Sequence, residues 1–188
     1  MVRVLAFSGS LRKESYNQKL VKIAAESARG VGAEVTLISL RDYPLPIFSE
    51  DLEAEGTPEN ARKLKELFLT HQGLLIASPE YNSSVTAALK NAIDWVSRAA
   101  PGEPGLAAFR GKTAGLMSAS PGALGGLRGL VHLRAILGNI QVLVLPDQLA
   151  ISGAANAFDE AGQLKDPRQK QGIEAIGIKL VETLKKLQ

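Results

Sequence analysis

The chain has 188 residues, of which 45% are apolar and 22% are charged, and its formal net charge is +3. This length and composition predict a single globular domain over residues 1–188, with a core large enough to fold without disulfides or a structural metal. The absence of cysteine excludes disulfides, thiolate metal sites, a cysteine nucleophile and a cysteinyl flavin linkage.

The charge distribution and the apolar stretches indicate which partners to expect. Lysine and arginine are spread along the chain among acidic residues, so we expect no nucleic-acid partner. No apolar stretch reaches the roughly 18 residues of a membrane-spanning helix, and Met1 leads almost directly into a strand. We therefore expect no membrane partner and a cytoplasmic location. The two histidines, His71 and His132, lack paired ligand spacing, so no metal site is predicted.

The chain opens with the pattern of a strand, a loop and a helix. Residues 2–8 form a short apolar run, which predicts the first strand, and residues 9–17 are polar and predict a loop. Helical spacing follows at once, with Leu20, Ile23 and Ala24 on one face. A loop at the start of such a helix has unpaired backbone N–H groups and a partial positive charge, which suit a phosphate.

Strand and helix signals then alternate to the end of the chain. Further strands are expected at residues 34–40, 73–78, 112–118 and 140–145, and further helices from Pro58 and over about 85–99, 126–137 and 166–187. Near-continuous apolar strands are buried on both faces, and helical crossovers imply parallel pairing. The sequence thus predicts an α/β fold, a doubly wound five-stranded parallel sheet in the flavodoxin-like order 2-1-3-4-5 with helices on both faces.

This topology places three loops together, because ligands bind beyond the carboxyl ends of the strands where the strand order reverses. The loops concerned follow Ser8, Ser78 and Ser118. The first contains only Gly9 as glycine, so it matches neither the dinucleotide fingerprint nor the Walker loop. Binding there would rest on serine hydroxyls and N–H groups, which favours one terminal monophosphate, as in FMN, over NAD or ATP. A plain alternative is equally open: Ser15 caps the helix and Gln18 completes a capping box.

The other two loops also have unusual compositions. In the second, Pro79 to Asn82 can present backbone groups to the edge of a flat ring, with Tyr81 as an aromatic wall. The third, at residues 118–126, is built of small residues that let a planar ligand approach the main chain. Ordinary turns would explain each loop alone, whereas a flavin explains all three together.

These residues resemble the NADPH-dependent FMN reductase family of flavodoxin-like proteins, which includes quinone, azo-dye and chromate reductases. The matching stretches are residues 9–12 with Ser15 and Asn17, residues 79–82 followed by 89–95, and residues 118–122 with 125–126. The resemblance implies a non-covalent FMN site. Its residues would be Ser10, Arg12, Ser15, Tyr16 and Asn17 around the phosphate, Pro79, Glu80, Tyr81 and Asn82 bordering the isoalloxazine, and Ser118 and Ser120 flanking it.

The same resemblance implies an FMN-dependent oxidoreductase that passes hydride from NADPH or NADH to a quinone, flavin, azo compound or metal oxyanion. No acid–base residue is required, because the chemistry takes place at the flavin N5. Glu80 is expected to make a backbone or interface contact rather than to donate a proton. The alternative is a flavodoxin-type electron-transfer protein without nicotinamide oxidation, which the mildly basic composition disfavours.

Family members suggest a homodimer or homotetramer, and two features bear on it. The loop at residues 41–57 could reach a partner's flavin, and Arg128 could bridge subunits or lie solvated. Ile93 and Val96 are expected to be core residues.

The chain also departs from many relatives, which carry glycine after the Pro-Glu-Tyr-Asn stretch and a Pro-Gly pair at the helix start. Here Ser83, Thr86 and Ala87 stand at those positions.

Overall fold

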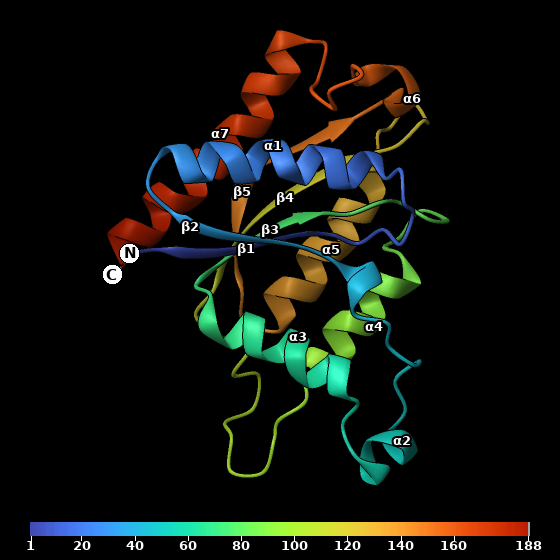
Figure 1. The fold of residues 1–188 in the computed structure, drawn as a ribbon, viewed down its shortest axis with the longest axis vertical. Coiled ribbons are helices and arrows are strands. Elements are labelled where there is room, and N and C mark those ends of the chain that lie inside the picture. The colour runs from blue at the N-terminus through green and yellow to red at the C-terminus, as the bar shows by residue number, and fades with distance from the viewer. Residues whose placement is uncertain (188) are drawn as a thin grey trace.

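A computed structural model describes residues 1–187 (Figure 1). Its strands form one parallel sheet in the order β2-β1-β3-β4-β5, as predicted. The strands are β1 (Arg3–Ser8), β2 (Glu34–Ser39), β3 (Gly73–Ala77), β4 (Thr113–Ala119) and β5 (Leu143–Ile151). The helices are α1 (Tyr16–Gly30), α2 (Glu50–Glu55), α3 (Glu59–Thr70), α4 (Ala87–Val96), α5 (Leu127–Asn139), α6 (Ala154–Ala157) and α7 (Pro167–Leu187), with a 3₁₀ turn at Leu40–Asp42.

Alternation along the strands divides the core into two layers. In β1, Val4 and Ala6 pack with α1 and α7 on one face, while Leu5 and Phe7 pack with α3, α4 and α5 on the other. All four side chains are buried, as expected for a strand covered on both faces. Figure 1 shows the sheet edge-on between these two helical layers. None of the described helices combines the length and hydropathy needed to cross a bilayer.

The bounds that the sequence pattern predicts for the fifth strand are wrong. The expected strand at 140–145 begins instead at Leu143, because Ile140 ends α5 and Gln141 adopts a left-handed turn with φ of 70°. The strand then continues past Pro146 to Ile151, where a loop was expected. Its register against β4 shifts between Ala114 and Leu116, and a bulge at an edge strand tolerates proline.

The helix after the second loop is shorter than expected. It was predicted over 85–99 but covers Ala87–Val96, since Thr86 is its N-cap and accepts a hydrogen bond from Leu89 N at 3.1 Å. The Thr86 hydroxyl also donates to the carbonyl of Gly9 at 2.5 Å. This contact joins the start of α4 to the first loop, and so fixes two of the three loops relative to each other.

Candidate functional site

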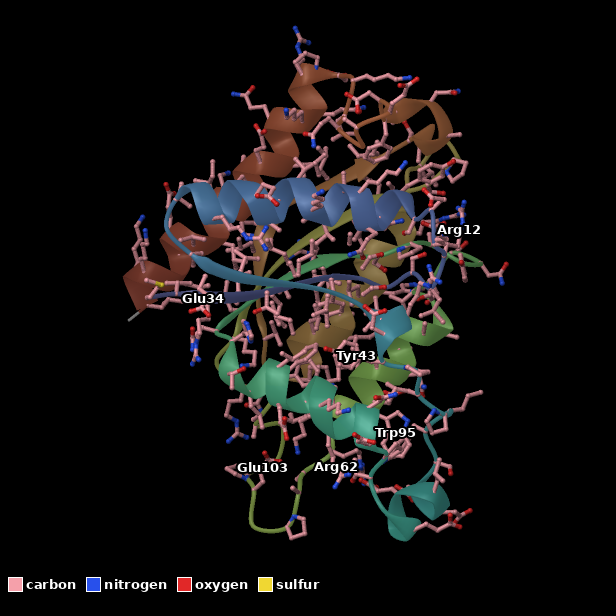
Figure 2. All side chains as sticks on the ribbon, viewed as in Figure 1. Arg12, Glu34, Tyr43, Arg62, Trp95 and Glu103 are labelled. Carbon is pink, nitrogen blue, oxygen red and sulfur yellow. The ribbon has the colours of Figure 1, made fainter. Side chains whose placement is uncertain are left out.

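The three predicted loops meet at the carboxyl edge of the sheet and form one cleft. Arg12 in Figure 2 marks this end of the molecule. The cleft is lined by Ser10, Arg12, Ser15, Tyr16, Asn17, Pro79, Glu80, Tyr81, Ala119, Ser120 and Pro121. The expected residues Asn82 and Ser118 are not among the lining residues, while Ala119 and Pro121 line the cleft without having been predicted. Both missed residues are immediate neighbours of Ser120 and lie in the stretch 118–122, so the composition of this loop and its resemblance to the family were the available signals.

The first loop folds on its own hydroxyls. Ser8 Oγ accepts from Ser10 N at 3.1 Å, and Ser10 Oγ accepts from Arg12 N at 3.2 Å. Ser15 caps α1 by accepting from Gln18 N at 3.2 Å. The capping box is incomplete, because the Gln18 side chain donates to the Ile38 carbonyl instead of returning to the Ser15 N–H. The N–H groups of the first two residues of α1 have no intrahelical acceptor and remain available to a ligand.

Arg12 is held above this helix start by aromatic contacts. Its guanidinium lies 5.3 Å from the centre of the Tyr16 ring. Tyr16 in turn stacks on Phe158, with ring centres 6.1 Å apart and planes inclined by 5°. Within residues 1–187, no carboxylate lies within ion-pair distance of Arg12. The cleft therefore contains one positive charge that no acidic side chain neutralises.

Asn17 joins the first loop to the third. Its buried amide donates to the Ala119 carbonyl at 2.8 Å and accepts from the Ala119 N–H at 2.9 Å. These two bonds match the donor and acceptor of a backbone group, so the amide substitutes for a neighbouring strand at the end of β4. Asn17 thus lines the cleft and also holds its walls at a fixed separation.

The second loop is a tight turn that presents Tyr81. The backbones of Tyr81 and Ser84 exchange two hydrogen bonds of 3.0 Å around Asn82 and Ser83, which both have positive φ, 50° and 66°. Two consecutive left-handed residues are the mark of a type I′ turn. The side chain of Ser84 is hydrogen-bonded to His132 Nδ1 at 2.9 Å. Tyr81 stays 53% exposed at the rim of the cleft.

Glu80 caps the start of α5 and is not placed to act as a proton donor. Its carboxylate accepts from the N–H groups of Arg128 and Gly129 at 3.0 and 3.2 Å, and from Arg128 Nε at 2.8 Å. Burial raises the pKa of Glu80, but the hydrogen bonds from Arg128 and Gly129 outweigh it, and the pKa lies below its usual value. The group is a carboxylate at neutral pH that neutralises the Arg128 charge, and the backbone contact expected for it is present.

Ser118 stabilises the third loop from inside. The residue is fully buried, and its hydroxyl donates to the Gly125 carbonyl at 2.8 Å. Gly126 packs against it with φ of 95°, and a Cβ there would lie 2.9 Å from the Ser118 side chain. Glycine is therefore required at this position for both conformation and space. Because β4 extends to Ala119, Ser118 lies within the sheet and does not line the cleft, and its place flanking a ring stays a prediction.

The described residues contain no group of three or more histidine, cysteine, aspartate or glutamate side chains that could bind a metal ion. His71 lies buried at the end of α3, on the amino side of the sheet, and His132 lies on α5. The chemistry of the cleft is instead that of hydroxyls, backbone N–H groups, one arginine, two tyrosines and the carboxylate of Glu80, which is paired with Arg128.

Comparison with known proteins identifies the family to which the chain belongs. A family model described as NADPH-dependent FMN reductase matches residues 2–156. The chain belongs to this family. It is 39% identical to an NAD(P)H-dependent FMN reductase of Pseudomonas aeruginosa over 175 residues, which cover 92% of this chain and 90% of that protein. It is also 39% identical to a quinone reductase of Pseudomonas putida, with 84% of this chain and 82% of the relative covered.

Solved structures agree with the sequence relatives. The flavoenzyme NAD(P)H:(acceptor) oxidoreductase FerB of Paracoccus denitrificans has a TM-score of 0.83 and 28% identity, with 99% of this chain and 98% of that chain covered. The predicted family, the flavodoxin-like fold and the use of FMN with NAD(P)H as donor are thereby confirmed.

Proposed function

We propose that the cleft binds the FMN phosphate with Ser10, Arg12, Ser15 and the free N–H groups at the start of α1. The donors fit a dianion: two buried hydroxyls, one arginine without an acidic partner and a helix N-terminus. The enclosed part of the cleft, about 70 Å³, is far below the roughly 300–1,000 Å³ of small-molecule pockets, so the rest of the ligand would lie along the open rim.

The remaining residues would orient the ring system. Pro79 and Tyr81 from the second loop and Ser120 from the third line the rim, and Asn82 fixes the turn that carries Tyr81. Bound FMN supplies hydride acceptance and donation at N5. The overall reaction converts NAD(P)H, a proton and a quinone into NAD(P)⁺ and a hydroquinone. No residue is assigned as a general acid, because Glu80 is held ionised by Arg128 and its oxygens are engaged.

The wider proposal includes acceptors other than quinones, namely free flavin, azo compounds and metal oxyanions, since an open rim imposes little shape selection. We also propose that a single domain works in the cytoplasm, where NAD(P)H is supplied, as a homodimer or homotetramer. Exposed apolar residues at the start of α5 support assembly: Leu124, Leu127 and Val131 are 51%, 42% and 58% exposed. A sedimentation mass of one chain would contradict this part.

Replacement of Arg12 tests the phosphate site. We expect Arg12→Ala to weaken FMN binding by roughly 10- to 100-fold, the value of one charge-assisted hydrogen bond of about 1.5–3 kcal/mol. Titration of FMN-free protein, followed by flavin fluorescence, measures the dissociation constant. Lys13→Ala is the matched control, because Lys13 is the adjacent exposed cation and does not line the cleft. Equal affinities for the two variants would refute the assignment.

Oxidation of the nicotinamide separates a reductase from an electron shuttle. The family relatives favour the reductase. Anaerobic mixing of the holoprotein with NADPH or NADH is expected to bleach the flavin absorbance, and a quinone added afterwards should restore it. Persistence of the oxidised spectrum with both donors would favour the shuttle.

A further inference from the structure

The segment that follows β5 lies beside the third loop of the cleft. It covers residues 152–165 and begins where the N–H of Ser120 donates to the Ile151 carbonyl at 3.0 Å and the N–H of Ala154 donates to the Ser120 carbonyl at 3.1 Å. No residue of this segment lines the cleft, and none belongs to the predicted site. Its bonds to Ser120 nevertheless fix it relative to the cleft wall.

The far part of this segment is a closed hairpin. Phe158 and Leu164 pair as an antiparallel bridge. At the turn, the N–H of Asp159 donates to the Gln163 carbonyl at 2.9 Å, and the Asp159 carboxylate accepts from the N–H of Gln163 at 2.8 Å. Phe158 and Leu164 are both buried in the core layer that contains α1 and α7. Backbone bonds and burial therefore hold Phe158 in place.

Phe158 contacts the first residue of α1. Its ring stacks on Tyr16, with ring centres 6.1 Å apart and planes inclined by 5°. Phe158 is buried whereas Tyr16 is half-buried, so the ring anchored in the core supports the more exposed one. The Tyr16 ring in turn lies 5.3 Å from the Arg12 guanidinium. Three side chains thus connect the core to the positive charge of the cleft.

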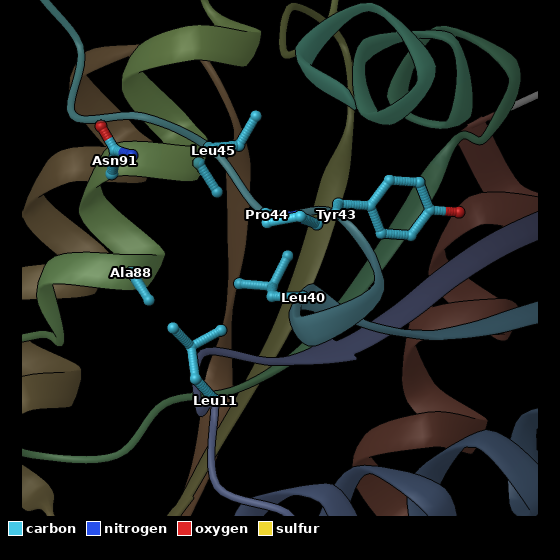
Figure 3. Close-up of a pocket in the computed structure, with 8 residues that line it drawn as sticks. Leu11, Leu40, Tyr43, Pro44, Leu45, Ala88 and Asn91 are labelled. Atoms are coloured by element: carbon cyan, nitrogen blue, oxygen red, sulfur yellow. The ribbon is translucent and has the colours of Figure 1, made fainter. Parts of the chain in front are cut away.

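The Tyr16 ring is the contact that places Arg12. Arg12 is exposed, and within residues 1–187 no carboxylate lies within ion-pair distance of it. The preceding side chain, Leu11, is directed towards a small apolar cavity that Pro44 and Ala88 also line (Figure 3). An aromatic face attracts a guanidinium, and an arginine held in advance loses less rotamer entropy when it binds an anion.

We propose that Phe158 is a positioning residue for the FMN phosphate, which acts through Tyr16 on Arg12. The inference rests on the proposed function and adds to it a residue that does not line the cleft. With the stack in place, the Tyr16 ring keeps Arg12 over the start of α1 before the phosphate binds. Without the stack, Tyr16 turns more freely and Arg12 samples more rotamers. The phosphate then loses affinity, whereas the ring system along the rim does not.

Comparison of FMN with riboflavin isolates the phosphate. Riboflavin has the same ring system and ribityl chain without the phosphate, so the ratio of the two affinities reports on the phosphate site. Titration of the full-length protein, freed of flavin and followed by flavin fluorescence, measures both dissociation constants. Phe158→Leu keeps an apolar side chain but removes the ring. We expect it to lower the ratio of FMN to riboflavin affinity about two- to fivefold, the value of one exposed cation–π contact. An unchanged ratio would overturn the proposal.

Two further variants separate positioning from stability. Phe158→Tyr retains a stacked ring and should restore the ratio of the unmodified protein. Phe109→Leu is the matched control, because Phe109 is also buried and packs on a second ring, Phe68, with ring centres 5.2 Å apart, but in the other core layer. It should retain the ratio even where it lowers the free energy of unfolding. An equal fall in Phe109→Leu would show that general loosening of the fold weakens phosphate binding, and the proposal would fail.

The route through Arg12 has a test of its own. In an Arg12→Ala background, Phe158→Leu is expected to leave the ratio of FMN to riboflavin affinity unchanged, because no guanidinium is left to position. The same fall in both backgrounds would show that Phe158 acts on the phosphate by another route, and would refute the proposal. If Phe158→Leu does not fold, Phe158→Met takes its place, since its flexible apolar side chain fills the space without a ring.

Failure of this inference and failure of the proposed function give different results. If the unmodified protein binds riboflavin as tightly as FMN, the proposed phosphate site fails, and the inference fails with it. If the unmodified protein prefers FMN and Phe158→Leu keeps that preference in full, the phosphate site stands and only the positioning role of Phe158 is refuted.

Discussion

Ser83 occupies a conformation that serine rarely adopts. Its φ of 66° lies in the left-handed region, where a Cβ costs about 1–2 kcal/mol. We expect Ser83→Gly to raise the free energy of unfolding by about 0.5–1 kcal/mol, because the relief of strain exceeds the added entropy of the unfolded chain. Urea denaturation of the FMN-free protein measures the change.

The neighbouring residue provides the control. Asn82 has φ of 50°, but asparagine tolerates this region because its short amide bonds locally, so Asn82→Gly should give a smaller gain. A loss of stability in Ser83→Gly, or a larger gain in Asn82→Gly, would show that the hydroxyl of Ser83 contributes more than its backbone costs.

At the scale of elements, α1 and β4 are joined by one buried side chain. Asn17→Ala removes both hydrogen bonds to Ala119 and leaves a buried N–H and carbonyl without partners, so we expect a loss of about 2–4 kcal/mol in stability. Thermal and urea unfolding of the FMN-free protein measure the loss without a contribution from cofactor binding.

A second variant at the same position checks the mechanism. Asn17→Asp keeps the acceptor for the Ala119 N–H but turns an oxygen towards the Ala119 carbonyl, and should be destabilising too. Gln18→Ala is the matched control, because Gln18 makes one partly buried bond from the same turn, with an expected cost of about 1 kcal/mol. Comparable losses for Asn17→Ala and Gln18→Ala would contradict the bridging role.

The elements that the sequence predicts well are those whose burial pattern is local. Apolar runs placed the first four strands to within a residue or two, and helical spacing placed Leu20, Ile23 and Ala24 on the buried face of α1. The fifth strand failed because a bulge at the sheet edge lets Pro146 sit inside it, which depends on the register against β4. The short helices α2 and α6 lie in stretches expected to be loops, where local turn chemistry carries little periodic signal.

The sequence also predicted only part of the site: the loops that form it, but not the long-range contacts that hold them together. Topology alone predicted which loops meet, and nine of the eleven expected residues line the cleft. Two contacts of the site could not be predicted from spacing along the chain. Asn17 bonds to Ala119, 102 positions away, and Glu80 caps α5 at Arg128, 48 positions away. The loop at 41–57 is bonded to its own α4, where Trp95 Nε1 donates to Pro46 O at 2.8 Å, while Ile47 stays 86% exposed.

On the scale of the whole molecule, the cleft and the buried positive charge of Lys112 lie at opposite edges of the sheet. The cleft lies at the carboxyl edge of the sheet, whereas Lys112 is buried at the amino edge and donates to the His71 carbonyl. Burial, together with the nearby Arg3, lowers the pKa of Lys112 to about 8. An unfolded chain restores it to about 10.4. Protonation of Lys112 therefore disfavours the folded state at neutral pH.

The sign of the resulting pH dependence follows from proton counting. Between about pH 8 and 10.4 the unfolded chain retains a proton that the folded protein has released, so this group makes the free energy of unfolding rise with pH across that window. Below pH 8 both states are protonated and the contribution is flat. We expect Lys112→Met to remove this rise, and urea denaturation from pH 7 to 10 compares its slope with that of the unmodified protein. Lys186→Met, which deletes an exposed positive charge near the end of α7, should retain the slope; if both variants lose it equally, net charge and not the burial of Lys112 governs alkaline stability.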